Sequence, residues 1–197
     1  MPIAAREITV PDPPRAWRRL GFAVGEDGGF PVGGVRLVTG APELAVRVAG
    51  LEADAPDGLA LTAAPGAEPA PPAAHPNGAV ALDHVVALTD DLGRTLAALQ
   101  AAGLDLRRVR DEARQGFLRL GPLILEVVEA EVPRPALWGL VAVVEDLDAC
   151  ASGLGGLLGT PRDAVQPGRR IAAVRREAGL VTALAFMTPR PQRTPPA

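Results

Sequence analysis

The segment that decides the fold of this chain is residues 82–130, which read LDHVVALTDDLGRTLAALQAAGLDLRRVRDEARQGFLRLGPLILEVVEA. It opens with an apolar, β-branched run over residues 82–88 that is typical of a buried strand. Thr89 or Asp90 can cap a following helix that presents leucines on one face and ends at Gly103. Three further strands are expected over residues 104–109, 115–120 and 123–129. The predicted order is strand, helix, three strands.

The same order occurs a second time over residues 137–188. Residues 141–144 match residues 86–89, and the Glu-Asp-Leu run at 145–147 matches Asp-Asp-Leu at 90–92. A tandem repeat of about fifty residues indicates two units that each fail to close a core alone and therefore pack on each other.

This tandem pattern, over roughly residues 80–189, resembles the vicinal oxygen chelate superfamily, which includes glyoxalase I, bleomycin-resistance proteins and extradiol dioxygenases. The resemblance implies an α+β fold in which tandem βαβββ modules form a curved, half-closed mixed sheet around a small-molecule cavity. It also implies a divalent metal, often held by side chains from the first and last strand of each module. In the first module His84, in LDHV, and Glu126, in LEVVE, occupy those positions.

The second module departs from the family pattern, because Gly139 aligns with His84 and Ala185 aligns with Glu126. At most half of a four-ligand site is therefore retained, and two protein ligands bind a divalent ion weakly. The main interpretation is that no cofactor is bound, and a divalent metal at His84 and Glu126 is the alternative. His75 could add a ligand only if the segment around it folded over the cavity.

The rest of the chain divides at a segment rich in proline and alanine. Residues 1–64 are interpreted as a degenerate N-terminal glyoxalase-like half-domain, with strands at 6–10, 22–24 and 35–39 and with Arg6 at the position of His84. Residues 65–79 are the linker. Residues 80–189 form the glyoxalase-like domain, with modules 80–131 and 136–189, and residues 190–197 form a flexible tail.

Glu126 is the candidate catalytic residue, because a carboxylate within an apolar strand is costly to bury without a partner. It can meet a metal, a basic side chain or solvent at the mouth of the cavity. A hydrogen bond between His84 and Glu126 without any metal is equally compatible with the sequence.

Other side chains are predicted to contact a ligand. Arg169 and Arg170 follow a turn, and their guanidinium groups suit carboxylate or phosphate, although solvated arginines would give the same pattern. Trp138 stands beside Gly139 and either stacks on a ligand or belongs to the core. Phe117 and Phe186 are expected to add aromatic side chains to the lining of the cavity. The predicted ligand-binding set is Phe117, Trp138, Arg169, Arg170 and Phe186.

Composition narrows the class of protein. The net charge of −3 over 197 residues gives no reason to expect nucleic-acid binding. No apolar run reaches membrane-spanning length and the N-terminus lacks a signal-peptide pattern, so we expect a cytoplasmic protein without a membrane partner. The single cysteine excludes an intramolecular disulfide. A homodimer is expected, because exposed edge strands need partners.

Three functions are compatible with these features. The first is binding of a small, partly apolar molecule in the cup of the sheet, with a degenerate metal site. The second is a metal-dependent glyoxalase-like lyase, isomerase or dioxygenase that uses His84 and Glu126, in which the metal acts as a Lewis acid. The third is a non-catalytic structural or interaction role.

Overall fold

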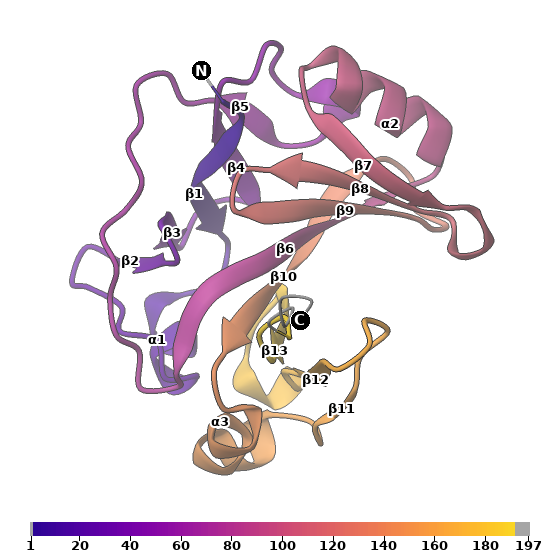
Figure 1. Cartoon of the computed structure of the whole chain (residues 1–197). Helices are drawn as coiled ribbons and strands as arrows, with labels where there is room; N and C mark the ends of the chain where they lie inside the picture. Colours follow the sequence, from indigo (N-terminus) through magenta and orange to yellow (C-terminus); the bar gives the residue numbers. More distant parts are fainter. Residues whose placement is uncertain (1, 192–197) are drawn as a thin grey trace, which may run out of the picture.

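Residues 2–191, which the computed structural model describes, form two mixed β-sheets and three α-helices (Figure 1). The strands of the first sheet are β1 (Ala4–Val10), β2 (Gly29–Val32), β3 (Val35–Thr39), β4 (Ala45–Ala49) and β5 (Leu61–Ala63). The strands of the second sheet are β6 (Ala79–Thr89), β7 (Asp105–Arg110), β8 (Gln115–Leu120), β9 (Leu123–Glu129), β10 (Ala136–Val144), β11 (Arg162–Asp163), β12 (Arg170–Ala173) and β13 (Ala183–Met187). The helices are α1 (Pro14–Arg19), α2 (Leu92–Ala101) and α3 (Leu147–Leu154).

The second sheet contains the two predicted modules. Its strand order is β11-β12-β13-β10-β6-β9-β8-β7, so β6 and β10, the first strands of the two modules, are neighbours at its centre (Figure 1). Each first strand pairs in parallel with the last strand of its own module, β6 with β9 and β10 with β13, and the two first strands are antiparallel. The predicted α+β fold with tandem βαβββ modules is confirmed.

The two long helices begin at equivalent aspartates. The side chain of Asp91 accepts a hydrogen bond from the backbone N–H of Arg94 at 2.9 Å, and Asp146 accepts one from Ala149 at 2.9 Å. The prediction that Thr89 or Asp90 caps α2 was one or two residues early. Thr89 is instead fully buried, and its hydroxyl bonds the hydroxyl of Thr95 at 2.6 Å.

One face of the second sheet belongs to the hydrophobic core. Buried side chains of β8 and β9, such as Leu118 and Leu125, lie in the same apolar cluster as Leu96 and Leu99 of α2. The cluster also extends into the first sheet. The opposite face of the sheet carries polar side chains, among them His84 and Glu126.

The first sheet repeats the pairing pattern of the second in reduced form. Strand β1 pairs in parallel with β3 and antiparallel with β4, as β6 pairs with β9 and with β10. Strand β4 pairs in parallel with β5, as β10 pairs with β13. Within residues 2–191 the first sheet has no strand corresponding to β7 and no helix corresponding to α3. The interpretation of residues 1–64 as a degenerate half-domain stays a prediction.

An aromatic cluster joins the first sheet to the second. Trp17, Phe22 and Phe30 lie with ring centroids 5.2–5.4 Å apart, and Phe22 stacks on Phe186 of β13 at 5.9 Å. The backbone N–H of Phe22 also donates a hydrogen bond to the carbonyl of Trp17, so the backbone turns after α1. For this reason the strand predicted over residues 22–24 does not form, and β2 begins at Gly29.

The predicted linker runs in an extended path along the first sheet. The N–H of Ala70 bonds the carbonyl of Gly34 at 2.9 Å, and Nε of Arg6 donates to the carbonyl of Ala67 at 3.0 Å. Most of the tail predicted over residues 190–197 lies outside the described residues, which end at Pro191. No helix in the described part of the chain is long and apolar enough to cross a membrane.

Candidate functional site

The site is built on a β-bulge in strand β6. His84 pairs with Val141 of β10 and Leu82 pairs with Ala142, which leaves Asp83 as the extra residue between them. An extra residue shifts the alternation of side chains by one position. Leu82 therefore joins the core face with Val85, whereas His84 lies on the opposite face. The bulge is also what allows Asp83 and His84, adjacent in sequence, to bond each other.

Four side chains form a continuous chain of polar contacts, which we call the cup cluster: Asp83, His84, Glu126 and Arg169. Nε2 of His84 lies 3.2 Å from Oε2 of Glu126, and Nδ1 of His84 lies 2.9 Å from Oδ2 of Asp83. Oδ1 of Asp83 accepts a 2.8 Å contact from Nη1 of Arg169. None of the four side chains is more than 16% exposed, so their charges interact strongly. The structure brings together the predicted pair His84 and Glu126 and the predicted Arg169.

The two carboxylates of the cluster titrate differently because their surroundings differ. Burial alone would raise the pKa of Asp83, but the hydrogen bond with His84 and the charges of Arg169 and His84 outweigh it and lower the pKa. Burial raises the pKa of Glu126 above its ordinary value, and the charges of His84 and Arg110 offset that rise only in part. Asp83 is thus the anion that balances Arg169, whereas Glu126 favours its protonated form more than an exposed glutamate does.

The strand register identifies what stands opposite the cup cluster. His84 pairs with Val141, and Val86 pairs with Gly139, so the approximate two-fold relation of the modules makes Gly139 the equivalent of His84. In the same way Glu126 pairs with Val86 and Ala185 pairs with Val141, so Ala185 is the equivalent of Glu126. The second module therefore presents no side-chain ligand at either position.

The residues present do not make up a divalent metal site. Within residues 2–191, no cluster of three or more His, Cys, Asp or Glu side chains could hold an ion. His75 does not add a ligand, because its two ring nitrogens bond the N–H of Ala23 and the carbonyl of Pro31 in the first sheet. The guanidinium of Arg169 also places a fixed positive charge beside Asp83, which disfavours a cation there.

A cavity of about 690 Å³ opens on the face of the second sheet that carries the cup cluster. Strands β7, β8 and β9 supply one wall, and the turn before β12 together with residues 190–191 supplies the other. A smaller cavity of about 220 Å³ adjoins it and shares Ile124, Arg169 and Arg190 with it. The larger cavity is lined by Arg108, Arg110, Phe117, Ile124, Val165, Gln166, Pro167, Arg169, Arg190 and Pro191.

The predicted ligand contacts divide into two groups. Phe117 and Arg169 line the larger cavity. Phe186 does not face the cup, because it is adjacent to Ala185 on a regular strand and is fully buried against Phe22. Arg170 points away as well and pairs with Asp148 of α3 at 2.6 Å.

Trp138 belongs neither to the core nor to this cavity. It is unpaired in a second bulge, between Leu137 and Gly139 of β10, and it is 53% exposed. The exposure contradicts the predicted core packing, whereas stacking on a ligand beside Gly139 stays a prediction.

Several residues at the site were not selected from the sequence. Asp83 was missed because regular alternation places it on the opposite face from His84, and only the bulge brings the two together. Arg108 and Arg110 of β7 also line the cavity. Arg190 was assigned to a flexible tail, but the chain after β13 returns across the sheet and places it at both cavities.

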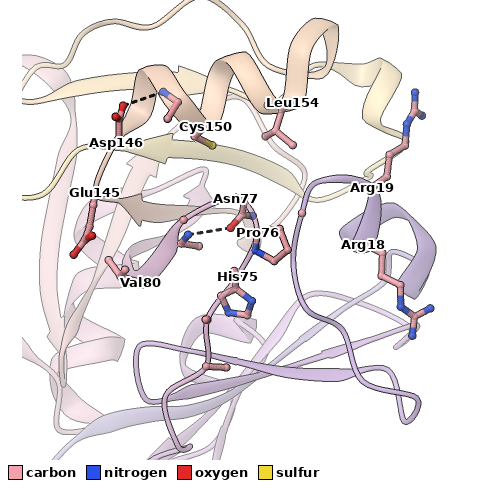
Figure 2. Close-up of a pocket in the computed structure, with 17 residues that line it drawn as sticks. Arg18, Arg19, His75, Pro76, Asn77, Val80, Glu145, Asp146, Cys150 and Leu154 are labelled. Atoms are coloured by element: carbon pink, nitrogen blue, oxygen red, sulfur yellow. Dashed lines mark hydrogen bonds between the residues drawn. The ribbon is translucent and has the colours of Figure 1, made fainter.

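A separate cavity of about 510 Å³ lies where α1, the linker and α3 meet (Figure 2). Figure 2 shows the guanidinium groups of Arg18 and Arg19 directed away from Cys150, and both donate to backbone carbonyls. Asn77 bonds the carbonyl of Leu20 and the N–H of Ala79. Because the side chains of Arg18, Arg19 and Asn77 already bond within the chain, they are less available to a ligand.

Comparisons with other proteins give likeness in structure alone. Neither a known protein family nor a curated protein matches the sequence. A methylmalonyl-CoA epimerase from Mycobacterium tuberculosis is 18% identical with a TM-score of 0.49, over 58% of this chain and 91% of that one. A Streptomyces coelicolor methylmalonyl-CoA epimerase in complex with 2-nitronate-propionyl-CoA is 17% identical with a TM-score of 0.48, over 59% and 99%. A hypothetical protein from Bacillus halodurans is 15% identical with a TM-score of 0.46, over 57% and 96%.

Likenesses at such low identity and TM-score do not say what this chain binds or catalyses. The fold is instead recognised in the chain itself, from the parallel pairing of β6 with β9 and of β10 with β13 and from the antiparallel contact between β6 and β10. In this arrangement of two βαβββ modules the chain resembles the vicinal oxygen chelate superfamily, as its sequence predicted.

Proposed function

We propose that this chain binds a small, partly apolar molecule in the cup of its second sheet. The observation that carries the proposal is the cavity of about 690 Å³, a volume within the range of small-molecule sites. Phe117, Ile124 and Val165 give it an apolar wall, and a few polar side chains converge on it. This combination of an apolar surface with few directed polar groups is typical of ligand pockets.

The test is a screen of fragment-sized aromatic and aliphatic compounds by saturation-transfer NMR. Hits are then measured by calorimetry on the wild type and on Phe117→Ala, which removes the aromatic part of the wall. Val181→Ala is the matched control, because Val181 is 85% exposed and does not line the cavity. Loss of binding in Phe117→Ala but not in Val181→Ala supports the proposal. Equal binding by all three proteins places the ligand elsewhere and refutes it.

A metal-dependent lyase, isomerase or dioxygenase is the competing function. One observation favours it: Nε2 of His84 and Oε2 of Glu126 lie 3.2 Å apart, a separation that two ligands of one ion can have. Elemental analysis of protein purified without chelator or affinity metal, for the wild type and His84→Ala, separates the two functions. A stoichiometric divalent ion that is lost in His84→Ala would overturn binding without metal. A wild type that takes up no nickel, zinc, iron or manganese would remove the competing function.

The expected homodimer and cytoplasmic location stay predictions. Strand β7 is at the edge of the second sheet, and an exposed edge can pair with a second copy. Light scattering coupled to size exclusion measures the mass directly, and a mass of one chain at all concentrations would remove the dimer.

A further inference from the structure

The buried arginine of the cup cluster identifies the class of ligand. We infer that the molecule bound in the cup is an organic anion, with a carboxylate or phosphate group held by Arg169 and the neighbouring arginines and an apolar body against Phe117. This inference rests on the proposed function, because it requires that the cup binds a ligand. Positive charge at this end of the cup then comes from guanidinium groups.

Arg169 is the anchor. Its side chain is 2% exposed, its Nε donates to the carbonyl of Thr188 at 2.8 Å, and its Nη1 contacts Asp83. Within residues 2–191 its third nitrogen, Nη2, is buried and has no hydrogen-bond partner. A buried charged donor without an acceptor is unfavourable. Since Arg169 lines both cavities of the cup, an oxygen of a bound anion can supply the missing acceptor.

The charges around the cavity all have one sign. The charged residues that line the larger cavity are Arg108, Arg110, Arg169 and Arg190. The whole chain carries a formal charge of −3, so this group of arginines is a local feature and not a property of the surface in general. Arginine forks suit carboxylate and phosphate oxygens in geometry as well as in charge.

The negative charge of Asp83 does not neutralise the arginines that line the cavity. It lies beside Arg169 and His84, and both of its carboxylate oxygens are engaged by these two residues. It therefore holds the guanidinium in place while Nη2 stays available. Glu126 contacts His84 at 3.2 Å and is not among the residues that line the larger cavity, so it does not face a bound anion there.

The remaining wall of the cavity defines the other half of the ligand. Phe117 and Ile124 lie on adjacent strands of the sheet, and Val165 and Pro167 face the cavity from the turn before β12. A ligand that satisfies both parts has a compact apolar body and one anionic group at its end. Simple aromatic acids meet this description and serve as probes.

The experiment compares matched probes that differ in charge. Phenylacetate, its neutral amide phenylacetamide, and phenyl phosphate are titrated into the full chain by calorimetry, with and without EDTA. We expect at least one of the two anions to bind about tenfold or more tightly than the amide, because hydrogen bonds to charged groups are the stronger ones. The relative affinities of the two anions distinguish a carboxylate from a phosphate ligand. EDTA should leave the affinity unchanged.

Arginine variants then locate the anion. Arg108→Gln and Arg110→Gln should each weaken anion binding severalfold or more, and Arg169→Gln should abolish it. Arg134→Gln is the matched control, because Arg134 is exposed and does not line the cup cavity. Arg169→Gln can also unfold the chain, since Arg169 is paired with Asp83, so its fold is checked by circular dichroism. The variants at Arg108 and Arg110, which are not buried, keep the test decisive in that case.

Each outcome bears on one statement. If phenylacetamide binds in the cup as tightly as the anions, the inference fails while the proposed function stands. If none of the three probes binds, the inference fails, and the fragment screen decides separately whether the proposed function stands. If EDTA removes binding, a metal ion and not a guanidinium holds the anion, and the inference is overturned. An equal loss in Arg134→Gln would mean general attraction of anions and would overturn it too.

Discussion

Replacing Asp83 with asparagine tests whether the cup cluster is a buried ion pair that the fold depends on. The side chains of Asp83 and Arg169 are 8% and 2% exposed, and arginine does not give up its proton. Removing the negative partner therefore leaves a buried positive charge without compensation, which in proteins costs about 3–5 kcal/mol. Asparagine keeps one oxygen that can accept from Arg169 or His84, so we expect the lower end, about 3 kcal/mol. For a chain of this length that is a fall in melting temperature of about 6–12 °C.

The assay is urea unfolding followed by circular dichroism at pH 7, with Asp148→Asn as the control. Asp148 also pairs with an arginine, Arg170, but it is 68% exposed, so its loss should leave stability nearly unchanged. The double variant Asp83→Asn with Arg169→Gln should be less damaging than the sum of the single changes, because it removes the uncompensated charge.

The dependence on pH gives a second readout of the same pair. The pKa of Asp83 in the fold lies below its ordinary value of 3.8, because the bond with His84 and the charges of Arg169 and His84 outweigh burial. The stability supplied by ionised Asp83 is therefore present above that ordinary value and is lost as the pH falls through the lower folded pKa. The gap between wild type and Asp83→Asn should be present at neutral pH and should close in stronger acid. A loss below about 1 kcal/mol at pH 7, as for a surface pair, or a gap that widens in acid, would refute the reasoning.

Three other predictions concern residues with different roles. Phe186→Ala should lower the free energy of unfolding by about 3–5 kcal/mol and leave cup binding intact, measured by urea unfolding and calorimetry; a loss of binding in a folded variant would contradict its assignment to the core. Burial raises the pKa of Glu126, so its contribution to stability is lost as the pH rises through the folded pKa. Glu126→Gln should therefore be more stable than wild type at pH 7 with no advantage in acid, and unfolding curves that show the reverse order would overturn this. Burial, with the nearby Asp146, raises the pKa of Cys150 to about 11, so at pH 8 only about one thiol in a thousand is ionised. Labelling by a disulfide reagent should be slow and should rise about tenfold per pH unit up to about pH 10, whereas a rate that levels off near pH 9 would show an ordinary thiol.

The fold was accessible from the sequence because it depends on patterns that repeat. Two copies of a strand, a helix that begins at an Asp-Leu pair and three strands are visible at the level of residue types, and the register of β6 with β10 places Gly139 and Ala185 where the alignment put them. The pattern did not identify the residue that caps α2, because Thr89, Asp90 and Asp91 are all good N-cap residues. In the structure the cap is Asp91.

The site was less accessible because it depends on departures from regular geometry. Period-two alternation predicts that Asp83 and His84 face opposite sides, and the bulge reverses this for Asp83. A similar irregularity in the first sheet moves Arg6. The register shift between Ala5 and Glu7 leaves Arg6 at the position of Asp83, and Glu7, not Arg6, is the equivalent of His84.

Two errors, by contrast, could have been avoided from the sequence alone. Ala185 and Phe186 are neighbours on one strand, as are Arg169 and Arg170 around the start of another, so only one member of each pair can face the cup. Placing Ala185 at a ligand position already assigns Phe186 to the core.

Gly139 makes the absence of a second metal ligand difficult to reverse. A Cβ atom at this position would lie 2.7 Å from the carbonyl oxygen and 2.9 Å from the Cβ of Ala183 on β13. The backbone of the neighbouring strand thus occupies the space that a histidine side chain would need in order to leave the main chain. Gly139→His by itself would force β13 to move before any ion could bind, so a return to the four-ligand pattern requires at least two changes that are useful only together.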